Sequence, residues 1–304
     1  MTKDFYRFFY TKKSGSHAII NWLADALGGN VAFYNNRRFR KCYLPTDTVS
    51  SGISISGTSK ELYAPKNDVH FNLATHAGPV FESFETQLLK PEWVPSRADC
   101  GVNRPGWDIV ILRDVYNYLA SEMIRNTRPA LSDFPEYAKT KNVARWRGYA
   151  DVFYAKNYIE QAKTHVLLDS WIHHAEVVLG ERDVLERPML VILFNRWFTE
   201  EAYRKEICET LDIPYSDRLL NSVARVNAKA GSWDDPRVYD GQATKMSVLY
   251  RWEFFAANPL YWEMLEKFPE TEILNQRIFG QTVPNRGQFP FGEAARRFRD
   301  ESRQ

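Results

Sequence analysis

A short polar segment, residues 13–17 (KSGSH), has the composition of a loop that binds an anion. It follows an apolar, aromatic run at residues 5–10, and apolar residues then recur at helical spacing over residues 19–27. A strand, a short loop with one glycine and a helix present backbone N–H groups and a positive helix end to an anion. The residues predicted to hold phosphate or sulfate are Lys13, Ser14, Gly15, Ser16 and His17. Alone, the segment is equally compatible with an ordinary strand-to-helix turn.

Two other places carry side chains suited to the same chemistry. Arg113 directly follows a strand-like run, residues 107–112, and Ser121 comes two turns into the helix that follows it. An arginine supplies charge and forked donors, and a serine supplies a compact one, so the pair predicts a second anion clamp. His76 ends a strand-like run at residues 69–75, where a near-neutral imidazole suits a general base. The alternative for His76 is a loop histidine that only bonds the backbone.

Strand-like runs alternate with helical stretches along the chain, which predicts an α/β fold with a parallel sheet. The runs at residues 5–10, 69–75, 107–112 and 189–194 are the expected strands. The expected helices follow three of them, near residues 19–27, 115–125 and 199–211, with a further helical stretch, one or two helices, at residues 154–179. Ligands of parallel sheets bind at the carboxyl ends of the strands, where all the candidate residues above fall.

Bulk composition excludes several classes of protein. The 304 residues carry a net charge of +2 and are 44% hydrophobic, which gives no general argument for binding nucleic acid or an anionic membrane. The three cysteines are widely spaced without a CxxC pair, so neither a disulfide framework nor a zinc site is expected. No signal peptide or run of about 18 apolar residues is present, and a cytoplasmic protein is expected.

The motifs resemble those of sulfotransferases that use 3′-phosphoadenosine 5′-phosphosulfate (PAPS). Residues 10–17 (YTKKSGSH) resemble the 5′-phosphosulfate loop, commonly YPKSG[TS][TN]W, although His17 and Ala18 stand where the family has Thr-Trp. The 3′-phosphate motif, R-[DN]-P-[RK]-[DN]-x-x-x-S, is matched in register by Arg113, Asp114, Asn117 and Ser121. Thr75 and His76 resemble the K-T-H-x-P strand end whose histidine is the catalytic base.

Two further elements match in part. Residues 227–233 (NAKAGSW) resemble the element that closes over the 3′-phosphate, which makes Arg225 and Lys229 candidate ligands or, with equal weight, solvated loop charges. The family's adenine contact is replaced at residues 195–197 (NRW), so Phe194 or Trp197 either stacks on the purine or, more simply, belongs to the core.

The resemblance implies one domain over residues 1–304, with the tail from about residue 277 as a peripheral extension. Its fold would be three-layer α/β, with a P-loop-like central parallel sheet flanked by helices on both faces. The implied enzyme moves a sulfuryl group from PAPS to a hydroxyl or amine of a small molecule, anionic or ring-bearing, and releases PAP without a metal. Lys13 would stabilise the leaving phosphate and His76 would accept the proton.

Two alternatives stay open at this point. One is a nucleotide-dependent P-loop kinase, although the GxxxxGK[ST] motif occurs nowhere in the chain. The other is a non-catalytic protein that binds a nucleotide or a glycan on the same fold. Neither the acceptor nor the oligomeric state is readable from the residues.

Overall fold

The computed structural model divides the chain into two compact units, Met1–Leu112 with His173–Ser222 and Arg113–Ile172 with Val223–Gln304. The residues that the structure describes are 4–28, 31–34, 78–85, 88, 94, 105–132, 163–186, 188–218, 248–255 and 259–280. The predicted strand at residues 69–75 and the tail after residue 280 lie outside them. The expectation of a single domain stays a prediction.

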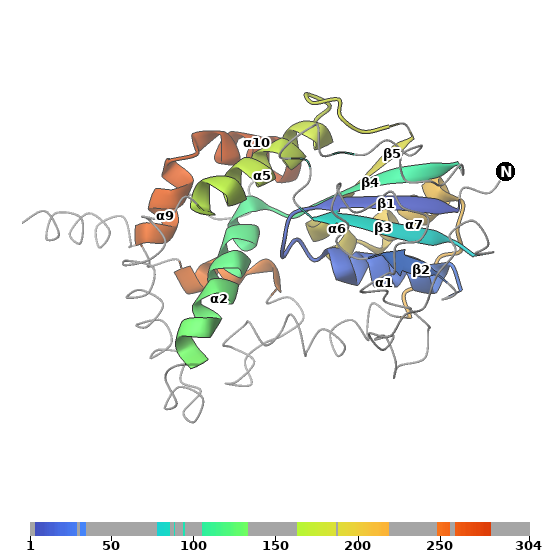
Figure 1. Cartoon of the computed structure of the whole chain (residues 1–304), viewed down its shortest axis with the longest axis horizontal. Helices are drawn as coiled ribbons and strands as arrows, with labels where there is room; N and C mark the ends of the chain where they lie inside the picture. The colour runs from blue at the N-terminus through green and yellow to red at the C-terminus, as the bar shows by residue number, and fades with distance from the viewer. Residues whose placement is uncertain are drawn as a thin grey trace, which may run out of the picture. The chain divides into compact units, whose positions relative to one another are not determined.

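A parallel sheet forms the centre of the first unit (Figure 1). Its five strands run in the order β2-β3-β1-β4-β5, so β1 lies in the middle and pairs with both β3 and β4. The strands are β1 (Phe5–Tyr10), β2 (Ala32–Tyr34), β3 (Val80–Glu85), β4 (Gly106–Leu112) and β5 (Met189–Leu193). The predicted α/β class with a parallel sheet is therefore confirmed.

Helices follow the strands in chain order. Those of the first unit are α1 (Ser16–Ala26), α6 (Phe194–Thr199) and α7 (Glu201–Leu211). Those of the second unit are α2 (Val115–Ser132), the 3-10 helix η8 (Arg251–Phe255), α9 (Pro259–Glu266) and α10 (Pro269–Phe279). The helix α5 (Lys163–Val178) contributes residues to both units. The helix predicted at residues 199–211 is observed as α7, and the short helix α6 before it was not predicted; the extended backbone of Glu200 separates the two.

Alternate residues of the strands form an apolar core on one face of the sheet. Phe9 stacks on Phe84 at 5.0 Å between ring centroids, and Val177 of α5 packs into the same cluster. The remaining buried members of this cluster are Phe5, Val80, Leu88, Val110 and Leu185. Continuous burial along β1 and β4 explains why both strands are readable as apolar runs.

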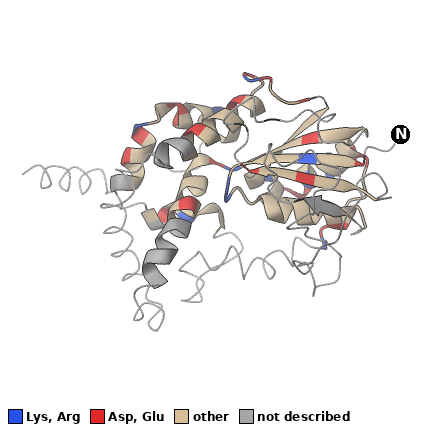
Figure 2. Ribbon diagram, in the orientation of Figure 1, with Lys and Arg blue, Asp and Glu red and all other residues tan. Residues whose placement is uncertain are grey.

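A row of charges interrupts this core at the middle of the sheet. Arg7 of β1 stands in register with Glu82 of β3 and Asp108 of β4, and all three side chains are buried. The Arg7 guanidinium donates to both carboxylate oxygens of Asp108, at 2.8 and 2.6 Å. Figure 2 shows this pattern as a basic position in β1 between acidic positions on the neighbouring strands. The strand β3 was not predicted, because Glu82 and Ser83 break its apolar run.

Candidate functional site

The segment between β1 and α1 is a tight loop with left-handed backbone at two positions. Lys13 and Gly15 both take the left-handed conformation, with φ of 58° and 84°. Gly15 is also the N-cap of α1, and it has no side chain to accept the first N–H groups of that helix. The positive end of α1 therefore stays uncapped by side chains at the place where the loop was predicted to bind phosphate or sulfate.

Gly15 is fixed from outside the loop by an aromatic ring. A Cβ atom at this position would lie 2.1 Å from Cε2 of Phe194, so the ring of Phe194 rests on the glycine. Phe194 and Trp197 of α6 are both buried, with relative exposures of 3% and 0%. In the first unit these two aromatics thus belong to the core that supports the loop, which is the simpler of the two roles predicted for them.

Two hydroxyl groups in the loop are buried. The side chains of Thr11 and Ser14 are both 0% exposed, and among the described residues neither hydroxyl oxygen has a hydrogen-bond partner. A buried polar group without a partner costs free energy, which an incoming oxyanion would recover. Ser14 lies between the two left-handed residues, so its hydroxyl belongs to the predicted cradle.

The charge of the loop comes from lysine. His17 lies in the first turn of α1 with an exposed side chain, and its ring contacts Tyr10 edge-on at 6.3 Å between centroids. Partial loss of hydration and the Lys13 ammonium lower the pKa of His17 below its usual 6.5. The imidazole is therefore neutral at pH 7, and Lys13 provides the positive charge of the loop.

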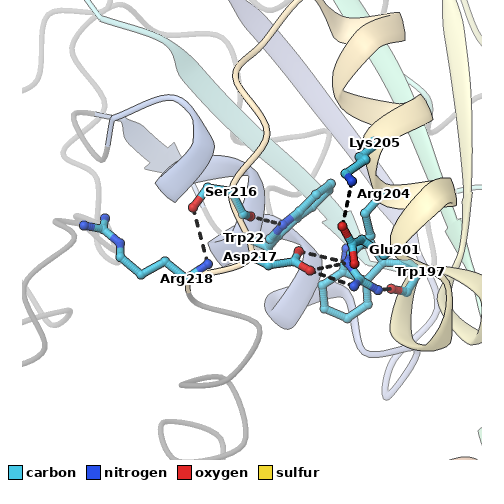
Figure 3. Close-up of polar contacts among 8 residues, drawn as sticks. All are labelled: Trp22, Trp197, Glu201, Arg204, Lys205, Ser216, Asp217 and Arg218. Atoms are coloured by element: carbon cyan, nitrogen blue, oxygen red, sulfur yellow. Dashed lines mark hydrogen bonds and ion pairs between the residues drawn. The ribbon is translucent and has the colours of Figure 1, made fainter.

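The helix α1 is held in place by the turn that follows α7 (Figure 3). The indole N–H of Trp22 donates to the carbonyl oxygen of Ser216 at 2.6 Å. Arg204 of α7 donates to both carboxylate oxygens of Asp217, at 2.9 and 2.7 Å, and to the carbonyl oxygen of Trp197 at 2.8 Å. Burial opposes ionisation of Asp217, but hydrogen bonds from Arg204 and Tyr215 lower its pKa overall. The contacts tie α1, α6 and α7 together beneath the loop.

Arg113 and Ser121, the two residues of the predicted clamp, both lie in the second unit. Nη1 of Arg113 donates to the hydroxyl of Ser121 at 2.9 Å, and both side chains are buried. The other end of the guanidinium donates to the carbonyl oxygen of Val248. The backbone of Arg113 is fixed as well, because the indole N–H of Trp171 donates to its carbonyl oxygen at 2.8 Å. The eight-residue step between arginine and serine thus brings the two side chains into direct contact.

The remaining matches of the 3′-phosphate motif serve the protein itself. Asp114 precedes α2 and accepts from the backbone N–H of Asn117 at 3.0 Å, as an N-cap does. The first N–H of α2, that of Val115, donates to Asn275 of α10 at 2.9 Å. Side chains thus cap the N-terminus of α2, whereas α1 has no side-chain cap bond among the described residues. If an anion binds near α2, its positive partners must be arginine side chains.

Arg251 bonds the same serine hydroxyl, although no sequence motif pointed to it. Its Nη1 donates to the hydroxyl of Ser121 at 3.0 Å, and the side chain is 7% exposed. Arg251 lies 130 residues from Ser121, inside an aromatic segment that reads as core packing. The one available signal was a lone basic residue between Tyr250 and Trp252.

Several predicted residues lie outside the described part of the chain. They are His76, Arg225 and Lys229, and the closing element at residues 227–233 lies there too. Their roles stay predictions. Residues 13–17, predicted to bind phosphosulfate, belong to the first unit, and Arg113 and Ser121 belong to the second.

Within the described residues, no three His, Cys, Asp or Glu side chains gather as metal ligands would. The same residues include no helix with the length and apolarity needed to cross a membrane. Comparisons of the chain with protein-family models, with curated proteins and with solved structures found no match.

Proposed function

We propose that the chain is a PAPS-dependent sulfotransferase of three-layer, P-loop-like architecture. The observation that carries the proposal is the buried hydrogen bond between Arg113 and Ser121. PAPS carries a 3′-phosphate in addition to its 5′-phosphosulfate, and a clamp of this kind is what the additional phosphate requires. ATP, the phosphoryl donor of a kinase, carries no 3′-phosphate.

The loop after β1 supports the other half of the proposal. Left-handed backbone at Lys13 and Gly15, the uncapped α1 and the buried Ser14 hydroxyl together suit a sulfate or phosphate group. The strand order of the sheet supports the architecture. The first strand, β1, lies in the centre, with β3 and β2 on one side of it and β4 and β5 on the other.

The proposed reaction is an in-line transfer. The acceptor oxygen or nitrogen attacks sulfur, the bond from sulfur to the 5′-phosphate oxygen breaks, and His76 takes the acceptor's proton. Negative charge develops on the leaving phosphate oxygen, where the Lys13 ammonium and the backbone N–H groups of the loop stabilise it. Arg113 and Ser121 hold the 3′-phosphate.

The first test measures thermal stability with two ligands. Adenosine 3′,5′-bisphosphate (PAP) is expected to stabilise the chain by about 2.7 kcal/mol at a hundredfold excess over its Kd. ATP with magnesium is expected to stabilise it much less. The reverse order would favour the kinase. Sulfate transfer or release from PAPS then separates an enzyme from a binding protein.

The second test uses neighbouring lysines as a matched pair. Lys13→Ala is expected to abolish turnover and to leave the affinity for PAP within a few fold, because the ammonium acts on the charge that develops during transfer. Lys12→Ala is the control, since the Lys12 side chain is 37% exposed and its ammonium lies 3.9 Å from the Glu85 carboxylate. Unchanged turnover in Lys13→Ala would remove the proposed role of Lys13.

A further inference from the structure

A serine stands inside the buried strand β3. Ser83 is 0% exposed, and a buried hydroxyl costs free energy unless it forms a hydrogen bond. The phenol of Tyr10, the last residue of β1, donates to the Ser83 hydroxyl at 3.0 Å. Tyr10 is paired with Glu85, and Ser83 lies two residues earlier on β3, so the side chains share one face of the sheet. The phenol therefore reaches a diagonal neighbour on the next strand.

The Tyr10 phenol also bonds the first residue of α1. Ser16 is 4% exposed, and its side chain is hydrogen-bonded to the phenol. A phenol has one proton, which goes to Ser83, so in the second bond Ser16 donates and Tyr10 accepts. Burial raises the pKa of Tyr10 above its usual 10 in spite of these bonds, so the phenol keeps its proton at neutral pH. Three hydroxyl groups thus join α1, β1 and β3.

These bonds restrain the N-terminal turn of α1. The carbonyl oxygen of Gly15 accepts from the N–H groups of Ala18 and Ile19, at 3.0 and 3.5 Å, so the helix begins directly after Gly15. The N–H groups ahead of Ala18 are the first of the helix, which have no partner within it. Ser16 carries one of them. Because Tyr10 holds the Ser16 side chain, the phenol also restrains the direction of this N–H group.

We propose that Tyr10 is a positioning residue for sulfuryl transfer, which acts by tying Ser16 to Ser83. The inference rests on the proposed function, because it concerns the loop at which the transferred group would bind. Tyr10 needs no contact with the donor, since it acts through the first turn of α1. The proton of the Ser16 hydroxyl is directed at the phenol, so Ser16 serves the transferred group through its backbone N–H.

The test measures catalysis and binding separately in Tyr10→Phe, which removes only the hydroxyl. The kcat of the full chain is measured for release of sulfate from PAPS with water as the acceptor. It is expected to fall about tenfold to a hundredfold, because a small misplacement of catalytic groups has a large effect on rate. The Kd for PAP, measured by isothermal titration calorimetry, should change less than about threefold, since PAP lacks the sulfuryl group.

Tyr6→Phe is the control, because it removes the same hydroxyl from the same face of the same strand. Tyr6 is 2% exposed, and its ring contacts Phe81 of β3 edge-on at 5.2 Å. Burial and the charges of Asp4 and Asp212 raise the pKa of its phenol to about 12. Tyr6 lies four residues before Tyr10, about 13 Å along the strand. Its replacement should leave kcat within about twofold of the wild type.

A second variant tests whether Tyr10 acts together with β3. Ser83→Ala should lower kcat less than Tyr10→Phe does, because the phenol keeps its bond to Ser16. In the Tyr10→Phe background, Ser83→Ala should have no further effect on kcat. Additive losses would mean that the two hydroxyl groups act independently, and the inference would be wrong.

The outcomes separate the two proposals. If the wild type releases no sulfate from PAPS, the proposed function fails and the inference fails with it. If the wild type is active and Tyr10→Phe keeps its kcat, only the positioning role is overturned. Equal losses in kcat and in affinity for PAP would also overturn it, because they would indicate a general disturbance of the loop. Should Tyr10→Phe not fold, Ser83→Ala decides, and a wild-type kcat in that variant would refute the inference.

Discussion

At Gly15, two independent restraints exclude every side chain. The backbone is left-handed, with φ of 84°, and the ring of Phe194 occupies the position of a Cβ atom. Gly28, just past α1, has nearly the same φ of 82° but nothing within 4 Å of an added Cβ. Substituting each glycine by alanine therefore distinguishes the free-energy cost of backbone strain, present at both positions, from that of a steric clash, present at Gly15.

Gly28→Ala is expected to lower the free energy of unfolding by about 1 kcal/mol, the cost of a left-handed L-residue. Gly15→Ala should lose that amount and roughly 1–3 kcal/mol more, because the Phe194 ring must move. Urea unfolding of the two variants gives the comparison. In the Gly15→Ala background, Phe194→Leu should restore part of the unfolding free energy that is lost to the clash. Equal costs at the two glycines would show that Phe194 does not restrain the loop.

The contacts of Ser121 show which contacts a local sequence motif can predict and which it cannot. The eight-residue step from Arg113 to Ser121 is local, because Arg113 stands two residues before α2 and Ser121 lies in that helix, so a sequence motif can relate the two residues. Arg251 meets the same hydroxyl from 130 residues away, and no local periodicity carries that information. The motif match at Asn117 was correct in register, but its amide binds protein main chain.

Among the elements, α1 depends on the turn after α7. Trp22 of α1 bonds the carbonyl oxygen of Ser216, and the next residue, Asp217, is the acceptor for Arg204 (Figure 3). The Arg204 side chain is 6% exposed and that of Asp217 is 28% exposed, so water weakens this ion pair only in part. The position of the helix that carries the loop therefore depends on a charged pair.

Asp217→Asn is expected to lower the free energy of unfolding at pH 7 by about 1.5–3 kcal/mol, the contribution typical of hydrogen bonds to a charged group. Because the pKa of Asp217 is lowered in the folded chain, the ionised form contributes stability above its unfolded pKa. That contribution disappears as the pH falls through the lower folded pKa. In urea unfolding, the difference between wild type and variant should thus be largest near pH 7 and should narrow as the pH falls through the acidic range.

The control for Asp217 is an exposed pair on a neighbouring helix. Arg196 and Glu200 form an i,i+4 contact at 3.0 Å, with side chains that are 47% and 45% exposed. Glu200→Gln should change stability by less than about 0.5 kcal/mol at any pH. A deficit in Asp217→Asn that does not vary with pH would mean that packing, and not charge, holds the turn.

At the scale of the whole chain, the prediction of strands relied on runs of consecutive apolar residues. The prediction succeeded for β1, β4 and β5, whose apolar residues are consecutive or nearly so. It failed for β3, because Glu82 and Ser83 stand inside a six-residue strand that is nonetheless buried. Glu82 is tolerated there because Arg7 stands opposite on β1, a pairing that depends on sheet order. Strand order is a tertiary property that periodicity does not encode.

The buried row Glu82–Arg7–Asp108 should be the most sensitive feature of the sheet. Arg7→Met keeps the apolar stem but leaves two carboxylates in the core, so a loss of about 3–5 kcal/mol in unfolding free energy is expected. Asp108→Asn should cost less, because Arg7 keeps Glu82 as its neighbour in register.

The double variant should be less destabilised than the two single losses combined, since removing the Asp108 charge relieves part of the charge that Arg7→Met leaves unpaired. Urea unfolding of the four proteins measures this coupling. Strictly additive losses would mean that the row contributes through packing alone, and that charge does not set the register of β1 against β4.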